Sequence, residues 1–386
     1  MFDLTSRLPD KTLSDPVESF DSNLAVLSQL VAGEHQTAAD QIARGAPSAG
    51  EFVAFLRRHG LDFYLSNQLQ ISPIREVIPQ DEVHRLEQFR RAQSGRQEAL
   101  VTELESISKL MGAEGIEFIL LKGPYLAQRF YADIDRRFFG DLDVLIKPQD
   151  LHRADKLLKA AGYSCRSSIL INQSLVRRFT HGFDYKRGAL RLDLHWSLGS
   201  HVSYRIDYDA VWRGCQTYRI EQTTCAVLSD EYTLLFHLLS YFEDLARGAG
   251  RLKTAMDIWV ILKILEPQVD WAAFLAARKE EGIEPICRTM LILCLDLLHS
   301  ERKFPLIEQA LNSPAPSSPA SVAERYSLLE ARRGSLRSKS WAATVYDCPR
   351  IVSMAWWVVS LPFRVMVYDP SQLARMVGLK TAGKRT

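Results

Sequence analysis

The sequence predicts an α+β fold in which a small mixed β-sheet with helices is flanked by N-terminal and C-terminal helical regions. Strand-like apolar runs alternate with helical patterns between residues 116 and 171. A hairpin pattern then joins residues 183–186 to a second alternating strand at 190–196. Long stretches of helical periodicity precede residue 112 and follow residue 229. This order of elements favours a small sheet backed by helices.

Composition limits the class of protein. The chain has 386 residues, enough for two or three structural units, and its 47% hydrophobic and 24% charged content is ordinary for a soluble globular protein. The net charge of +2 gives no reason to expect sequence-specific DNA binding. Six cysteines without a Cys-x-x-Cys pair suit reduced thiols in a cytoplasmic protein. The N-terminus has neither a basic start nor an apolar core, so we expect no signal peptide.

Residues 1–112 are predicted to form an N-terminal helical region. Prolines and acids are frequent in residues 1–35, which we expect to be partly irregular. The pattern becomes helical over residues 36–69, where Ser48 suits the N-cap of a capping box. A single long helix is then expected over about residues 80–111.

Residues 113–228 are predicted to form the sheet. Its expected elements are a strand at 116–121, a helix at about 124–132, a strand at 141–146, a helix from Pro148 to Ala161, a weak strand at 163–171 and the hairpin. Residues 229–311 are predicted to be a helical domain that completes the cleft, beginning at Ser229 as N-cap.

The C-terminal part is predicted to be a Ser/Pro-rich linker at 312–321 and a basic, apolar helical tail at 322–386. From residue 331 onward, ten Lys and Arg stand against two Asp. The apolar segment 351–368 approaches the length of a membrane span, but Pro362 and Arg364 interrupt it. We expect a buried helix there, with a peripheral membrane contact as the alternative because cationic, aromatic-rich segments favour anionic interfaces.

The strand that begins at Gly140 carries the first chemical signal. Side chains alternate along a strand, so Asp141 and Asp143 point to the same side. Two neighbouring carboxylates repel each other unless a cation lies between them, and Mg²⁺ or Mn²⁺ prefers such oxygen ligands. An isolated Asp-x-Asp is a weak motif, and aspartates that simply face water at a strand end are the alternative.

Two flanking stretches strengthen this signal. The first strand ends in Lys122-Gly123-Pro124, which indicates a tight turn into a helix. A glycine there lets backbone N–H groups approach a phosphate, and a helix N-terminus adds favourable partial charge. Downstream, Asp193 and His195 share the polar side of the strand at 190–196, so Asp193 offers a third carboxylate.

Together, Leu121–Gly123, Arg137–Ile146 and Leu192–Trp196 resemble the uncharacterised nucleotidyltransferase family within the polymerase-β-like superfamily. The resemblance covers about residues 100–265 and implies a glycine turn, a paired-acid strand and a third acid on a later strand. One departure is that Lys122-Gly123 replaces the usual Gly-Ser or Gly-Gly turn and is followed by proline. Proline removes one backbone donor, so we expect the Lys122 ammonium to provide more of the phosphate binding.

The resemblance implies transfer of a nucleoside monophosphate from an NTP to an acceptor hydroxyl, with release of pyrophosphate. Two Mg²⁺ (or Mn²⁺) ions would lower the pKa of the acceptor and stabilise the leaving group. Asp141 and Asp143 would bridge both ions, and Asp193 would hold the ion nearest the acceptor. A hydrogen-bond anchor at the end of the hairpin is the alternative role for Asp193.

The candidate nucleotide-binding residues are Lys122, Gly123, Arg137, His195, Arg251 and Lys253. Each cationic or imidazole side chain has an alternative. Lys122 could be an ordinary solvated lysine, Arg137 could pair with an acid instead of a phosphate, and His195 could be a structural hydrogen-bonding residue. The polar face that Arg251 and Lys253 form with Asp257 could be merely solvated.

A second class of function stays open. The chain could be a non-catalytic scaffold of the same fold that binds a nucleotide, a partner protein or a membrane surface, although a scaffold has no need of all three acids. A metal-dependent phosphohydrolase shares the acids, but the several histidines that such sites gather are missing from the motifs. The sequence identifies neither the base of the NTP nor the acceptor, which could be a protein, a sugar, a peptide product or RNA.

Overall fold

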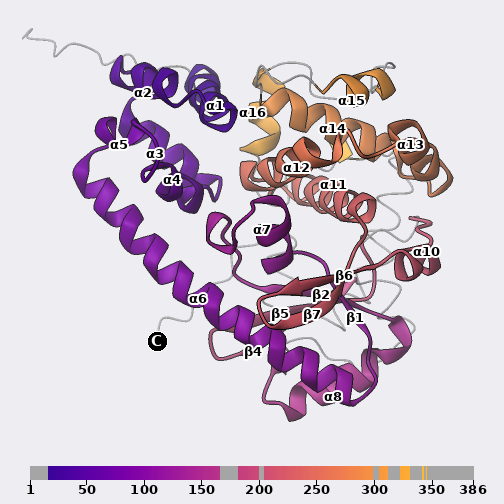
Figure 1. The fold of residues 1–386 in the computed structure, drawn as a ribbon. Helices are drawn as coiled ribbons and strands as arrows, with labels where there is room; N and C mark the ends of the chain where they lie inside the picture. The colour runs from indigo at the N-terminus through magenta and orange to yellow at the C-terminus, as the bar shows by residue number, and fades with distance from the viewer. Residues whose placement is uncertain are drawn as a thin grey trace, which may run out of the picture.

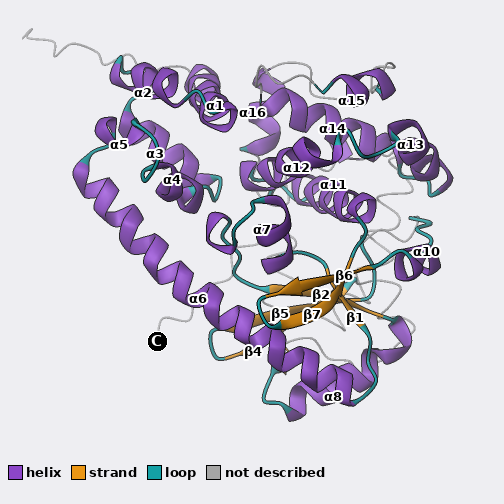
Figure 2. Ribbon diagram, viewed as in Figure 1, coloured by secondary structure: helices purple, strands orange, loops and turns teal. Residues whose placement is uncertain are grey.

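The computed structural model describes residues 16–165, 181–199, 204–298, 304–311 and 322–330, together with residues 341, 342 and 345. Within them the chain has the predicted α+β fold, with a mixed sheet surrounded by helices (Figures 1 and 2). The sheet occupies the lower part of the view in Figure 1, with the N-terminal helices at the upper left and the later helices at the upper right. The predicted domain boundaries stay a prediction.

The described strands form one seven-stranded sheet in the order β3-β4-β5-β2-β1-β7-β6. The strands are β1 (Phe118–Leu120), β2 (Leu142–Ile146), β3 (Ser164–Cys165), β4 (Gly182–Arg187), β5 (Leu190–His195), β6 (Gln216–Ile220) and β7 (Thr223–Val227). Strand β2 is antiparallel to β1 and parallel to β5, and β1 is parallel to β7. The central position of β2 therefore places its side chains between those of two neighbouring strands.

The predicted hairpin is confirmed as β4–β5, in which Arg187 pairs with Leu190 across a two-residue turn. The β6–β7 hairpin is absent from the sequence prediction. Its turn begins with Glu221 at a φ of 50° instead of the Gly or Asn that normally marks such a turn. Both strands are also rich in polar residues, so their alternation is weak.

Short helices precede the sheet. They are α1 (Pro16–Ala32), α2 (His35–Ala43), α3 (Ala49–Arg58), α4 (Asp62–Gln68) and α5 (Ile74–Val77). The expectation that residues 1–35 are partly irregular is wrong for the described part, because α1 covers residues 16–32. Pro16 suits the first turn of a helix, and Phe20, Leu24 and Leu27 recur at helical spacing on its buried side.

The N-cap of α3 confirms the predicted capping box. The Glu51 N–H donates to Ser48 Oγ at 3.4 Å, and the Ser48 N–H donates to Glu51 Oε2 at 3.0 Å. Both donors would otherwise lack a helical partner. The sequence therefore fixes where α3 begins.

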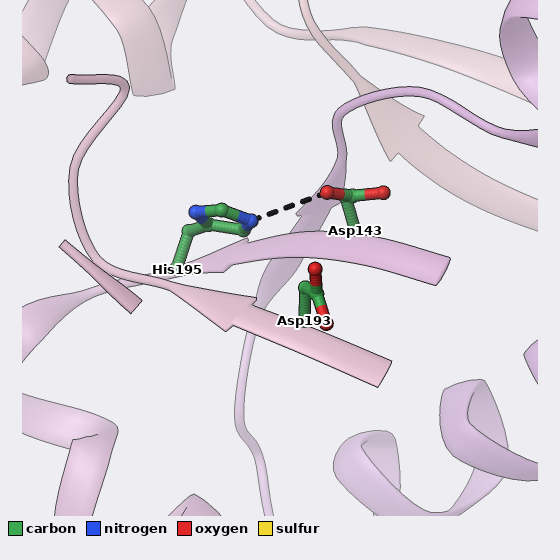
Figure 3. Close-up of side chains that lie close together, drawn as sticks. All are labelled: Asp143, Asp193 and His195. Carbon is green, nitrogen blue, oxygen red and sulfur yellow. Dashed lines mark hydrogen bonds and ion pairs between the residues drawn. The ribbon is translucent and has the colours of Figure 1, made fainter. Parts of the chain in front are cut away.

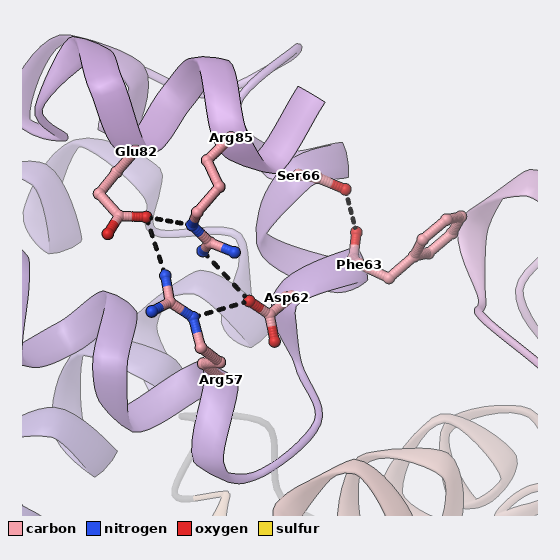
Figure 4. A network of polar contacts seen from close by, with 6 residues as sticks. All are labelled: Arg57, Asp62, Phe63, Ser66, Glu82 and Arg85. Carbon is pink, nitrogen blue, oxygen red and sulfur yellow. Dashed lines mark hydrogen bonds and ion pairs between the residues drawn. The ribbon is translucent and has the colours of Figure 1, made fainter. Parts of the chain in front are cut away.

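An ion-pair network ties α3 and α4 to the start of α6 (Gln80–Ala113), as Figure 4 shows. Arg57 contacts Glu82 at 2.9 Å and Asp62 at 3.4 Å. Arg85 contacts the same two carboxylates at 2.6 and 3.3 Å. Since the side chains are only partly buried, each pair contributes little alone, and the shared carboxylates link the three helices as a network.

Helix α6 confirms the predicted long helix and passes along the sheet, beside α8 (Leu151–Ala160). The Tyr185 hydroxyl of β4 donates to Asp155 of α8 at 2.8 Å, so the apolar side of β4 faces α8. Residues that alternate with Tyr185 point to the opposite side. Asp184 and its neighbour Asp193 therefore lie on the face of the sheet away from α8.

The remaining helices complete the description. They are α7 (Pro124–Phe130), η1 (Ile134–Arg136), η2 (Pro148–Asp150), α10 (Tyr208–Arg213), α11 (Asp230–Ala246), α12 (Leu252–Leu265), α13 (Trp271–Glu280), α14 (Glu284–Leu297), α15 (Pro305–Ala310) and α16 (Val322–Leu329). The Tyr232 N–H donates to Ser229 Oγ, which confirms the predicted N-cap of α11.

The linker at 312–321 and the apolar segment at 351–368 lie outside the described residues. Among the helices that the structure does describe, none has the length and apolar character needed to cross a membrane.

The packing of α6 generates a stability prediction. Leu104 is fully buried on this helix, so Leu104→Ala should lower the free energy of unfolding by about 2–5 kcal/mol. The side chain of the neighbouring Glu105 is 42% exposed and forms an ion pair with Lys109 one turn away, so Glu105→Ala should change the free energy of unfolding by about 0.5 kcal/mol or less. Urea unfolding of both variants measures the difference. Equal effects would show that α6 does not depend on its buried face.

Candidate active site

Strand pairing places two of the predicted acids side by side. On the parallel strands β2 and β5, Asp143 is paired directly with Asp193, so their side chains project from the same face. Figure 3 shows both carboxylates and the His195 ring gathered at the two strands, with a dashed contact between His195 and Asp143. The third acid therefore lies next to the paired-acid strand, as the sequence resemblance implies.

Asp143 is the most enclosed member of the group, with only 1% of its surface exposed. Its Oδ1 atom lies 3.0 Å from Lys122 Nζ and 3.3 Å from His195 Nε2. Its Oδ2 atom is buried and has no hydrogen bond with any described residue. A buried carboxylate oxygen without a partner is costly and indicates a place for a cation or a water molecule.

One oxygen each from Asp143 and Asp193 and one nitrogen of His195 lie within 4.8 Å of one another. This donor set fits a single divalent ion, because two carboxylates suit Mg²⁺ or Mn²⁺. The imidazole is a donor that Mn²⁺ and softer ions accept more readily than Mg²⁺ does. The set differs from the predicted one, since His195 is in it and Asp141 is not.

Asp141 lies immediately before β2, at the entrance to the strand. The negative charge of Asp143 raises the pKa of Asp141, and burial adds to this shift. The two carboxylates are therefore close enough to interact strongly. The structure keeps Asp141 beside the group without making it one of the three converging ligands.

The pKa values of Asp143 and Asp193 are shifted in opposite directions. Burial works against ionisation of Asp143, but the Lys122 charge and the His195 contact hold its pKa below the usual value. Burial raises the pKa of Asp193, and repulsion from Asp143 and Asp184 raises it further. Carboxylates held this close ionise together more easily when a further cation lies between them.

The ammonium group of Lys122 provides a positive charge next to the acids, since it forms an ion pair with Asp143. Burial alone would lower the pKa of its ammonium, but Asp143, Asp141 and Asp193 together raise it above the usual value. Its backbone position is fixed because the preceding Leu121 N–H donates to the Asp143 carbonyl at 2.9 Å. Lys122 is thus an ion-pair partner in this structure and not an ordinary solvated lysine.

Gly123 forms the predicted turn between β1 and α7. Its φ of 74° lies in the left-handed region, and a Cβ placed there would lie 3.4 Å from the Asp141 carbonyl. The positive φ favours glycine at this position, and the carbonyl lies at van der Waals contact distance from where a side chain would begin. The turn is thereby packed directly against the start of the acid strand.

His195 is positioned by close packing from two sides. A Cβ added at Gly182 would lie 3.1 Å from His195 Nδ1 and 2.9 Å from the Leu194 carbonyl, so β4 approaches the ring only because residue 182 is glycine. Phe236 of α11 packs against the ring edge-on, with the ring centroids 6.2 Å apart. His195 is therefore fixed with its Nε2 atom toward Asp143.

Arg137, a predicted phosphate ligand, forms a buried ion pair in this structure. Its guanidinium donates twice to Asp257, both at 2.7 Å, and Tyr131 donates to the same carboxylate at 2.7 Å. Lys253 Nζ lies 3.6 Å from Asp257. Burial and the Arg137 charge lower the pKa of Lys253 to about 8. The Arg137 Nη1 atom is buried and makes no hydrogen bond with a described residue.

Arg251 and Lys253 lie at the start of α12, where the N-terminal helices contact it. The Lys253 N–H donates to the His59 carbonyl at 3.3 Å, and Gly60 lies close to the Arg251 side chain. Arg251 is exposed, whereas Lys253 is about one quarter exposed. Of the two, Lys253 has the closer electrostatic link to the acids, since Asp141 contributes to its pKa shift.

The N-terminal helices also hold the loop that leads into β2. Arg96 of α6 donates to the Gly140 carbonyl at 3.1 Å, and Gln97 donates to the Arg137 carbonyl at 3.2 Å. Phe63 of α4 packs against Phe138, with the ring centroids 5.9 Å apart. The position of Asp141 therefore depends on helices far away in the sequence.

Two polar residues near the group are absent from the sequence prediction. Asp184 pairs with Asp193 across the β4–β5 hairpin, and the His181 ring lies 5.6 Å from the His195 ring. A signal for Asp184 exists in the sequence. Once the two-residue turn at Gly188 is recognised, counting back along the hairpin pairs Asp184 with Asp193.

A cavity of about 500 Å³ lies elsewhere, at the opposite end of β1 and β2 around Phe118, Lys147 and Trp212. None of the candidate site residues lines it. The converging carboxylates, and not the size of a cavity, therefore identify the site.

A mixed sheet with carboxylates from two neighbouring strands beside a glycine turn defines the class of protein as a nucleotidyltransferase-type fold. The chain belongs to a family described as "Uncharacterised nucleotidyltransferase", whose sequence profile matches residues 46–299. The predicted family is confirmed, and the match extends into the N-terminal helices beyond the predicted 100–265. No match is found among curated proteins.

The buried Arg137–Asp257 pair generates a prediction about stability and pH. Asp257→Asn leaves the Arg137 guanidinium buried without its full counter-charge, so the free energy of unfolding should fall by about 3–5 kcal/mol near neutral pH. Arg137 and Lys253 hold the pKa of Asp257 below its usual 3.8 against the effect of burial. The pair therefore stabilises the wild type above that value, and this advantage is lost as the pH falls further.

Unfolding of the wild type and of Asp257→Asn should thus converge in acid and differ most near neutral pH. Asp244→Asn is the control, because Asp244 is 38% exposed and lies on the neighbouring helix α11. Its effect should stay within about 0.5 kcal/mol. A deficit in Asp257→Asn that does not change with pH would contradict the assignment.

Proposed function

We propose that this protein transfers a nucleoside monophosphate from an NTP to an acceptor hydroxyl. The observation that carries the proposal is the direct pairing of Asp143 with Asp193, together with an Asp143 Oδ2 atom that is buried and has no hydrogen-bond partner among the described residues. The family membership supports the same reaction type. In the reaction, the acceptor oxygen bonds to the α-phosphorus, and the bond from that phosphorus to the leaving pyrophosphate breaks.

The residues that would hold a divalent cation are Asp143 and Asp193, with His195 as a nitrogen donor and Asp141 at the edge. When bound, such an ion (Mg²⁺ or Mn²⁺) supplies positive charge that stabilises the transferring phosphate and the leaving group. The convergence of Asp143, Asp193 and His195 supports a site for one ion. A second ion would depend on Asp141.

The chain's own residues divide the remaining tasks. Asp193 lies beside Asp143 at the proposed ion and would accept the proton of the acceptor hydroxyl. Lys122 is the nearest cation to the acids and would neutralise part of the triphosphate charge, with Gly123 shaping the turn beneath it. Lys253 would add a second positive charge from α12.

For Arg137 the sequence leaves two roles open, a phosphate ligand or a partner of an acid, and the contact with Asp257 supports the second. Because Asp257 binds it through two hydrogen bonds, we assign it to positioning Lys253 and the loop before β2. Only its free Nη1 atom could reach a phosphate. Arg251 is exposed at the same end of α12, and its positive charge would attract the nucleotide phosphates from a longer distance.

A non-catalytic scaffold that binds a nucleotide, a partner protein or a membrane surface is the second candidate. The ion pair between Lys122 and Asp143 favours it, because it neutralises one acid without any metal. The two candidates differ in how nucleotide binding depends on metal. The enzyme should bind an NTP much more tightly with the cation, since Asp143 and Asp193 alone repel phosphate.

Substitution of Asp143 tests the proposed chemistry. Asp143→Asn should lower transfer of label from α-³²P NTPs to an acceptor in host lysate by at least about 100-fold, because it removes a charge that binds the cation. Asp21→Asn, which changes an exposed aspartate on α1, should leave transfer unchanged. Circular dichroism checks that both variants fold. Transfer at the wild-type level by Asp143→Asn would remove the assignment.

Identification of the labelled product addresses the acceptor. Separating the lysate into protein, RNA and small-molecule fractions after labelling shows whether the acceptor is a protein, a sugar, a peptide product or RNA. Comparing labelled NTPs in parallel gives the base preference.

Thermal shift separates the enzyme from the scaffold. An NTP should raise the unfolding temperature of the wild type in the presence of Mg²⁺ and have little effect in its absence, because ligand binding stabilises only the form that binds. Asp193→Asn should lose the metal-dependent part of the shift. An equal shift with and without metal would favour the scaffold.

A further inference from the structure

A third aspartate extends the acid pair into a row across three neighbouring strands. Asp143 on β2 pairs with Asp193 on β5, and Asp193 pairs in turn with Asp184 on β4. Directly paired residues on neighbouring strands project from the same face of a sheet, and neighbouring strands lie about 4.8 Å apart. The three carboxylates therefore form a line that runs from the buried centre of the sheet toward its outer strands.

The fold gives no reason for an aspartate at residue 184. Its neighbours Phe183 and Tyr185 are buried on the opposite face, whereas Asp184 is exposed. Within the described part of the chain, no hydrogen bond or ion pair involves its carboxylate. Like charges directly opposite each other destabilise a pair of strands, so Asp184 opposite Asp193 lowers the stability of the sheet.

An independent observation at the inner end of the row indicates a cation. Asp143 is 1% exposed, and its Oδ2 atom has no hydrogen-bond partner among the described residues. The Nδ1 atom of His195 is likewise buried without a described partner. A buried carboxylate oxygen in this state leaves a place for a cation or a water molecule, and a row of acids that repel one another favours the cation.

We propose that Asp184 is a positioning residue of this metal site, an outer carboxylate that holds a water ligand of the ion bound by Asp143 and Asp193. The proposal rests on the proposed function, because it needs a divalent ion at the inner pair. Outer carboxylates orient the inner ligands and the waters of a metal ion, and their loss typically weakens metal binding by about 10–100-fold. Asp184 is exposed, whereas Asp143 is buried, so Asp184 lies at the solvent-accessible end of the row.

Electron paramagnetic resonance of Mn²⁺ tests the proposal without any measurement of activity. Free Mn²⁺ gives a strong signal that is lost on binding, so a titration yields the dissociation constant of each variant. We expect Asp184→Asn to raise this constant by about 10-fold or more relative to the wild type. Asp184→Glu keeps the charge and should retain most of the affinity. Asp21→Asn, an exposed aspartate far away on α1, should match the wild type.

Two further results distinguish failure of this inference from failure of the proposed function. If the wild type binds Mn²⁺, Asp193→Asn does not, and Asp184→Asn binds as tightly as the wild type, Asp184 has no part in the site and only this inference falls. If the wild type itself binds no Mn²⁺, the metal site and the inference fall together. Thermal unfolding of Asp184→Asn at or above the wild-type midpoint is expected, because the substitution removes a repulsive pair.

Discussion

The structure depends on the repulsion between carboxylates that the sheet holds side by side. Strand pairing fixes Asp143 opposite Asp193, and neither can move away without breaking the register of the central strands. One internal cation, Lys122, satisfies only one oxygen of Asp143. The carboxylate oxygens left without a partner favour a cation there, which under the proposed function would in turn attract an anionic substrate.

The surrounding elements can be understood as supports for this constraint. The Gly123 turn and the β1–β2 pairing fix the Lys122 backbone, whereas Phe236 and the Gly182 contact fix the His195 ring. The N-terminal helices hold the loop before Asp141 through Arg96. These helices are therefore part of the machinery that positions the acids, which agrees with a family match that begins at residue 46.

Much of this architecture could be predicted from local sequence patterns. Alternation identified β2 and β5, the Ser48 capping box identified the start of α3, and the three motifs in order identified the family. Patterns failed where structure depends on distant contacts. The β6–β7 hairpin has a turn without a typical turn residue, and α1 was obscured by the prolines and acids around it.

The site likewise has parts that local sequence patterns predict and parts that depend on distant contacts. The pairing of Asp143 with Asp193 follows from motif order, but the roles of Arg137 and Asp257 depend on a contact between residues that are 120 positions apart. No pattern within one segment reveals that Asp257 neutralises Arg137. The inclusion of His195 among the converging donors and the exclusion of Asp141 likewise depend on side-chain directions, at the end of β5 and before the start of β2.

The central claim is that Asp143 and Asp193 jointly bind a divalent ion. Anomalous scattering from crystals grown with Mn²⁺ and a non-hydrolysable NTP tests it most directly. The account predicts a manganese peak bonded to both carboxylates, with the nucleotide phosphates on its Lys122 side. A nucleotide bound in this site with no manganese at the two aspartates, or with manganese elsewhere, would contradict it.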